Sequence, residues 1–67
     1  MRILLNGDPF DAEEGLTVAA LLERLGVNGE RVAVEVNLEV VRKPARGDRR
    51  LLEGDQVEIV SFVGGGQ

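Results

Sequence analysis

The residues of this 67-residue chain best suited to chemistry are the three consecutive glycines at positions 64–66, which Gln67 follows. Glycine has no Cβ, so such a segment, roughly 10 Å long when extended, can enter a site too narrow for other residues. A carboxylate at the end of this segment is unreactive toward nucleophiles until it is activated, most simply as an acyl-adenylate made from ATP. We therefore expect residues 64–67 to form a flexible tail on which another protein acts.

The composition argues against catalysis by the chain itself. Histidine and cysteine are both absent from the sequence, which removes the commonest general base, the thiolate nucleophile and the commonest zinc ligands. A domain of this size buries only about 60% of the surface of its unfolded chain, which leaves little room for a catalytic cavity. We expect no catalytic residue, no metal site and no bound cofactor.

The overall charge and hydropathy exclude two further classes of partner. Twelve acidic and eight basic residues give a net charge of -4, which has the wrong sign for nucleic-acid binding. No window reaches the 18 or more apolar residues of a membrane span, and the apolar N-terminal run is too short for a signal peptide. We expect a cytoplasmic protein that is a monomer on its own.

Five of the eight basic residues fall within positions 42–50. Two interpretations of this basic stretch are open. It is either a solvated loop or a docking surface for an acidic partner protein.

Alternating apolar residues predict a strand over 1–6, and Asn6-Gly7-Asp8 predicts a tight turn into a second strand over 9–12. Thr17 is a suitable N-cap, and the residues at 18, 21, 22 and 25 share one helical face that ends at Gly26. Further strands are expected over 32–37, 40–41 and 57–62, with a turn at 53–55.

This order of elements predicts an α+β fold of the ubiquitin-like β-grasp type over residues 1–63. In that fold a mixed sheet of four to five strands packs on one main helix, and the first and last strands pair in parallel at its centre. The expected core consists of aliphatic residues from the helix and the strands: Ile3, Leu5, Val18, Leu21, Leu22, Leu25, Val32, Val34, Val36, Leu52, Val57 and Ile59.

Three apolar residues are expected on the sheet face that the helix does not cover. Because the first and last strands would be neighbours, we predict that Leu4, Val60 and Phe62 lie close together there. Adjacent exposed apolar side chains beside the tail would form a docking patch for partner proteins.

Several ordered segments resemble the ThiS family of sulfur carriers in thiamine biosynthesis. They are Leu5-Asn6-Gly7, Thr17-Val18 with Leu21-Leu22 and Leu25-Gly26, Val32-Ala33-Val34-Glu35-Val36-Asn37, and the stretch from Leu52 through Val60 followed by Phe62-Val63-Gly64-Gly65-Gly66. Each segment alone is weak evidence for this resemblance, but the ordered set spans nearly the whole chain and is specific.

The resemblance implies that Gly66 is the modified residue, with Gly64 and Gly65 as the rest of the tail. A ThiF-like adenylyltransferase would activate its carboxylate with ATP and magnesium, and a cysteine desulfurase would supply the sulfur of a thiocarboxylate. The acceptor would be the thiazole synthase ThiG. Gln67 departs from the family pattern, so it is removed before activation, or it is not part of the natural chain, or this chain is inactive as a carrier.

Two alternative functions share the predicted fold. The small subunit of molybdopterin synthase uses the same tail chemistry but has a longer chain around its helix. A β-grasp module that only binds a partner, without ever being thiolated, is the alternative from a different class.

Overall fold

In the computed structural model, which describes residues 1–62, the chain begins with a hairpin of two strands. β1 (Arg2–Leu5) and β2 (Asp8–Asp11) pair antiparallel. The turn between them contains Asn6 with φ 49° and Gly7 with φ 88°, the left-handed conformations that a two-residue type I′ turn requires. The hairpin predicted from the Asn-Gly pair is therefore confirmed.

The α-helix α1 (Val18–Leu25) begins and ends at the predicted capping residues. The Thr17 Oγ accepts a hydrogen bond of 3.1 Å from the Ala20 backbone N–H, which satisfies one of the free donors at the helix N-terminus. Gly26 ends the helix in the left-handed conformation, with φ 71°. The buried side of the helix carries Val18, Leu21 and Leu22.

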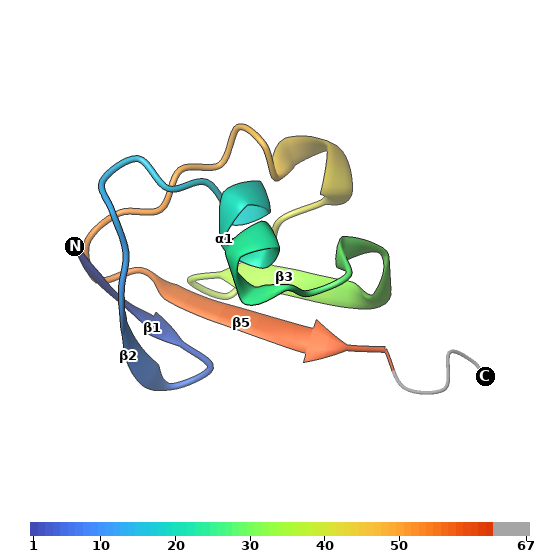
Figure 1. The fold of residues 1–67 in the computed structure, drawn as a ribbon. Coiled ribbons are helices and arrows are strands. Elements are labelled where there is room, and N and C mark those ends of the chain that lie inside the picture. The colour runs from blue at the N-terminus through green and yellow to red at the C-terminus, as the bar shows by residue number, and fades with distance from the viewer. Residues whose placement is uncertain (63–67) are drawn as a thin grey trace.

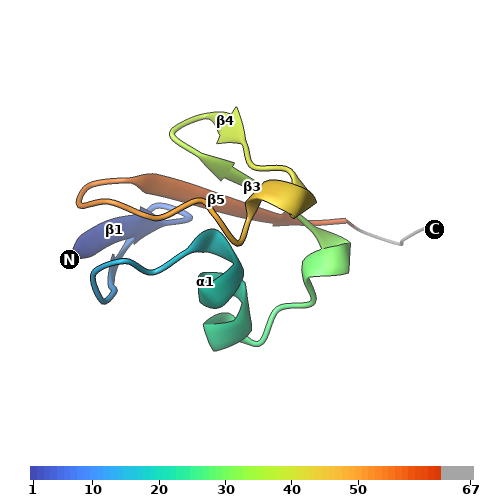
Figure 2. The same cartoon turned by 90° about the horizontal axis from the view of Figure 1, so that it is seen from above.

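The rest of the chain completes the sheet. It contains two short 3-10 helices and three strands: η1 (Gly29–Arg31), β3 (Val32–Val36), β4 (Glu39–Val40), η2 (Lys43–Ala45) and β5 (Gln56–Ser61). The strand order is β2-β1-β5-β3-β4, with β5 parallel to β1 and antiparallel to β3. The helix packs on one face of this sheet, and β5 crosses its middle (Figures 1 and 2). This is the predicted β-grasp arrangement.

The core lies between α1 and the covered face of the sheet. Eight of the predicted core residues are buried: Ile3, Val18, Leu21, Leu22, Val32, Val34, Val36 and Val57. Leu5, Leu25 and Ile59 are partly buried against them. Four buried apolar residues were not predicted: Ala12, Leu16, Val41 and Leu51.

The prediction that Leu52 belongs to the core is wrong. Leu52 is 64% exposed, whereas its neighbour Leu51 is 1% exposed. The Leu51 N–H donates to the Leu16 carbonyl at 2.8 Å, and the Leu52 N–H donates to the buried Asp55 carboxylate at 2.8 Å. These contacts place the pair in a loop, in which Leu51 is turned toward the core and Leu52 toward solvent.

Candidate functional site

The C-terminal end of β5 is the part of the described chain from which residues 63–67 continue. β1 pairs with β5 only at Gln56 and Val57, whereas β3 pairs with β5 as far as Ser61. Beyond the strand, the Phe62 N–H donates to the Arg31 carbonyl at 2.9 Å. The last part of β5 is therefore held along one edge by the segment at the start of β3.

A side chain continues the hydrogen bonding of β5 where β1 ends. The Asn6 Oδ1 accepts from the Ile59 N–H at 2.8 Å, and the Asn6 Nδ2 donates to the Ile59 carbonyl at 3.4 Å. The amide thus replaces a peptide group of a longer strand. The sequence identified Asn6 as a turn residue, but this second role depends on the register between β1 and β5, which no local pattern shows.

The predicted docking patch is only partly contiguous. Val60 and Phe62 lie two residues apart on β5 and its extension, and they are 56% and 54% exposed. Leu4 is half-buried and lies opposite Gln56, four residues from Val60, or about 13 Å along the strand. The structure therefore brings Val60 and Phe62 together next to the residues that lead into the tail, and it places Leu4 at a distance on the same face.

Two carboxylates lie side by side on the open face, at a level along β5 between those of Leu4 and Val60. Glu58 of β5 is directly opposite Glu35 of β3, and neither forms an ion pair within residues 1–62. Like charges in this position destabilise a sheet slightly. The open face thus combines an acidic centre with an apolar end beside Phe62.

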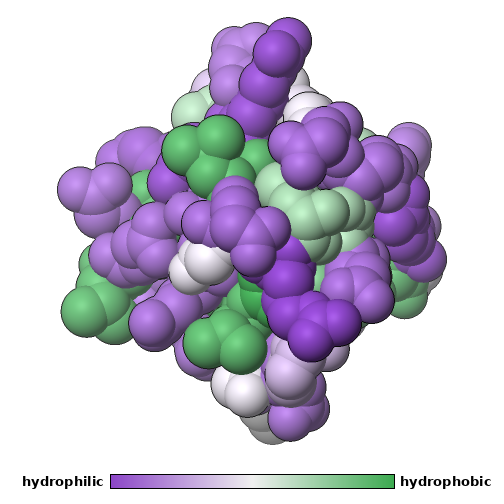
Figure 3. Space-filling view, turned by 90° about the vertical axis from the view of Figure 1, so that its left-hand side faces the viewer, coloured by the Kyte–Doolittle hydropathy of each residue, from purple (hydrophilic) through white to green (hydrophobic). Residues whose placement is uncertain are grey.

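The opposite end of the molecule, where β5 begins, has no comparable surface. Leu38 and Leu52 belong to turns at this end and are 85% and 64% exposed. In the view of this end, hydrophobic residues form separate spots between hydrophilic ones (Figure 3). Scattered apolar residues of this kind are ordinary on protein surfaces.

The basic stretch is not a uniformly solvated loop. Lys43 pairs with Glu30 at 2.7 Å, and the Arg49 Nη1 donates to the Arg50 carbonyl at 2.9 Å. Arg46 is only 7% exposed and donates to two backbone carbonyls. Arg46 therefore stabilises the fold itself, whereas Arg42, Lys43 and Arg50 are exposed.

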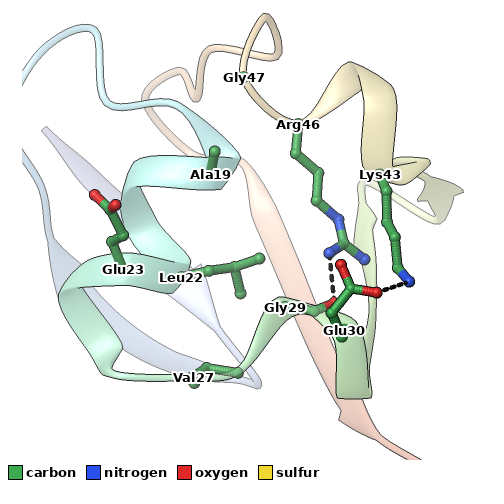
Figure 4. Close-up of a pocket in the computed structure, with 9 residues that line it drawn as sticks. All are labelled: Ala19, Leu22, Glu23, Val27, Gly29, Glu30, Lys43, Arg46 and Gly47. Atoms are coloured by element: carbon green, nitrogen blue, oxygen red, sulfur yellow. Dashed lines mark hydrogen bonds and ion pairs between the residues drawn. The ribbon is translucent and has the colours of Figure 1, made fainter.

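A pocket of about 340 Å³ lies between α1, η1 and η2 (Figure 4). Leu22 and Val27 contribute apolar walls, and Glu30, Lys43 and Arg46 contribute charges. The hydrogen bond from Lys43 is the main reason why the pKa of the Glu30 carboxyl lies below its ordinary value, and the positive charge of Lys43 is the second. The two groups of this ion pair neutralise one another, and the pocket offers no nucleophile of the serine or cysteine type.

The described part of the chain contains neither a cluster of metal-ligating side chains nor a membrane-spanning helix. Within residues 1–62, no group of three or more acidic side chains is arranged to hold a metal ion. In the same range, no helix is long and apolar enough to cross a membrane. The predicted tail residues Gly64, Gly65 and Gly66, together with Gln67, lie outside the described residues.

The comparisons with known proteins agree on one family. The model of the ThiS family matches residues 3–66. A crystal structure of the thiamine biosynthesis protein ThiS from Geobacter metallireducens superimposes with a TM-score of 0.83 at 40% identity, covering 98% of this chain and all of that protein. A sulfur carrier protein ThiS from Thermus thermophilus is 41% identical over 96% of this chain and 98% of its own length.

Two relatives are much longer than this chain, which spans about a fifth of their length. A thiazole synthase from Magnetococcus marinus is 51% identical over all 67 residues, and the chain spans 21% of its length. The family match, which includes the tail glycines, favours ThiS over both the small subunit of molybdopterin synthase and a module that only binds a partner. The chain belongs to the ThiS family, in which a relative of about the same length is a sulfur carrier protein.

Proposed function

We propose that the chain carries sulfur for thiamine biosynthesis as a thiocarboxylate on Gly66. The observation that supports this most is the extent of the family match, which reaches through the three glycines and ends at Gly66. The domain would serve as a rigid handle, because β5 is at the centre of the sheet and leads directly toward the tail.

The chemistry requires an activating enzyme. Where Gln67 is present, hydrolysis of its peptide bond must first free the Gly66 carboxylate. In the proposed first step of activation, a Gly66 carboxylate oxygen attacks the α-phosphorus of ATP, and pyrophosphate leaves. A sulfur atom at the oxidation level of sulfide then displaces AMP from the acyl-adenylate and leaves a thiocarboxylate. We assign the first step to a ThiF-like adenylyltransferase that uses magnesium. We assign the supply of sulfur to a cysteine desulfurase, whose persulfide sulfur a thiol reductant brings to the level of sulfide.

The proposed acceptor of the sulfur is a thiazole synthase. A segment similar to this chain makes up about a fifth of two proteins of that name, with 21% and 20% of their lengths covered. A covalent link between two domains raises the concentration of each near the other, which would favour transfer of sulfur from one to the other. We place these reactions in the cytoplasm, where ATP is available.

The apolar pair beside the tail is the proposed docking patch. Val60 and Phe62 are both more than half exposed, and the backbone of Phe62 is held by Arg31. An enzyme that binds the two side chains would receive the following residues in a defined direction. Leu4 would contribute only where the bound enzyme extends further along the sheet.

The position of the reactive carboxylate can be tested by comparing two forms of the chain. One ends at Gly66, and the other retains Gln67. An extra residue would displace the carboxylate by roughly 3.5 Å and place a Cβ where the site expects glycine. With ATP and the cognate activating enzyme, pyrophosphate release should be rapid for the first form and at background for the second. Equal rates would contradict the assignment to Gly66.

A further inference from the structure

Arg46 is a charged side chain that is buried close to the end of β5. It is 7% exposed and follows η2 directly. Its Nη1 donates to the Gly29 carbonyl at 2.8 Å, and its Nη2 donates to the Val32 carbonyl at 3.0 Å. The guanidinium thus links η2 to the two ends of η1. Figure 4 shows its contact with Gly29 beside the pocket.

The burial of this guanidinium is not explained by an ion pair. Within residues 1–62, no carboxylate forms an ion pair with Arg46, and its buried Nε has no hydrogen-bond partner. The nearby Glu30 carboxylate is bound by Lys43. Since a buried charge without a paired charge is costly, apolar packing alone would favour a hydrophobic residue here.

The carbonyls that Arg46 binds flank the residue that anchors Phe62. Gly29 and Val32 lie on either side of Arg31 in the chain, and the Arg31 carbonyl accepts the Phe62 N–H at 2.9 Å. Val32 is also paired with Ser61. Because β1 does not reach this far along β5, this segment is the main backbone support for the end of the strand.

The local sequence leaves room for the guanidinium. Gly29 has no Cβ, and a Cβ built there would lie 3.3 Å from the Arg46 Nη1. This is closer than most real contacts allow, so a larger residue would press on the guanidinium. The two hydrogen bonds of the Arg46 guanidinium therefore depend on the close approach of the Gly29 backbone.

We propose that Arg46 is a positioning residue, which fixes the point where the tail leaves the domain by holding the segment that anchors Phe62. This inference rests on the proposed carrier function. An activating enzyme must receive the carboxylate in one place, and a misplacement of about 1 Å can cost on the order of 100-fold in rate. Loss of the Arg46 contacts would let the end of β5 move, although the residue itself need not touch the enzyme.

The test compares Arg46→Met with Ile3→Val, both in the form ending at Gly66. Methionine keeps an apolar side chain of similar length but donates no hydrogen bond. Ile3 is fully buried in β1, so its variant provides a core change that leaves the Arg31 segment untouched. The temperature of each assay is set so that both variants are folded to the same extent.

Two quantities are measured for each variant. In Arg46→Met, hydrogen exchange of the Phe62 amide should be roughly tenfold faster than in the wild type. Its kcat/KM for ATP-dependent pyrophosphate release should fall by roughly tenfold. In Ile3→Val, both quantities should stay at the wild-type level. Arg46→Lys retains the charge but not the planar guanidinium, so its exchange rate and kcat/KM should lie between those of the wild type and Arg46→Met.

The outcomes separate this inference from the proposed function. Wild-type exchange at Phe62 together with wild-type kcat/KM in Arg46→Met would overturn the positioning role, even if the wild-type chain is a good substrate. If the wild-type chain is not activated at all, the carrier function fails, and the exchange of the Phe62 amide alone decides whether Arg46 holds the segment. If Arg46→Met does not fold, Arg46→Lys decides: normal exchange at Phe62 overturns the inference, and faster exchange supports it.

Discussion

Along β5, successive side chains point to opposite faces of the sheet and meet different surroundings. Val57, on the face covered by α1, is fully buried, whereas Val60, on the open face, is 56% exposed. The two residues have the same side chain and are only three positions apart. The difference shows that one face of this small sheet supplies the core, and that the other leaves apolar surface available beside the tail.

The largest expected effect is on the covered face. Leu22→Ala should lower the free energy of unfolding by about 2 to 5 kcal/mol, because Leu22 is buried in the middle of α1. Val60→Ala on the open face should change it by less than about 0.5 kcal/mol. Denaturant midpoints measure both, and equal midpoints for the two variants would show that the faces do not differ in this way.

On the open face, the expected effect is on binding. Phe62→Asp should weaken association with the activating enzyme by about 2 kcal/mol, roughly 30-fold, since a charge would be buried in the contact. The fold should remain stable because Phe62 is 54% exposed. Leu38→Asp is the matched control, as Leu38 is an exposed apolar residue at the other end of β5. Calorimetric titration giving the same affinity for both variants would rule out the docking patch.

Replacement of Leu38, which lies in a turn and not on either face of the sheet, should stabilise the fold. It has φ 70° in the two-residue turn between β3 and β4, directly after Asn37 with φ 53°. The left-handed conformation costs a non-glycine residue about 1 to 2 kcal/mol, and Asn-Gly suits such a turn best. Leu38→Gly should raise the free energy of unfolding by about 1 kcal/mol. An unchanged or lower thermal midpoint would contradict the strain at this position.

The smallest effect concerns pH. Hydrogen bonds from Arg24 to Glu13 and from Lys43 to Glu30 lower the pKa of each carboxyl from the ordinary value of 4.5. A lowered pKa in the folded state means that these pairs stabilise the fold fully above pH 4.5, and that this contribution is lost as the pH falls through the lowered values. Because the groups are exposed, the thermal midpoint should fall only slightly on acidification. In Glu13→Gln the fall should be smaller still, and an identical fall would exclude this pair as its source.

The elements with several agreeing local signals were predicted well. Thr17, the apolar stripe and Gly26 all indicate the same helix, and the structure has its caps at those residues. The Asn6-Gly7 turn was likewise predictable, because few residue pairs accept two left-handed conformations in succession.

The features that were not predicted depend on contacts between distant segments. Arg46 lies in a basic loop but is buried, since its partners at Gly29 and Val32 are 17 and 14 residues away. Leu4 was placed on the correct face, but its distance from Val60 follows from the register with β5. Local spacing contains neither kind of information.

The most direct test of the central claim is the mass of the intact chain ending at Gly66 after incubation with ATP, a ThiF-like enzyme, a cysteine desulfurase with cysteine, and a thiol reductant. Replacement of one carboxylate oxygen by sulfur should add about 16 Da, and the same chain without ATP should show no change. An unchanged mass, with an enzyme pair that thiolates another ThiS carrier in parallel, would contradict the account of this chain as a sulfur carrier.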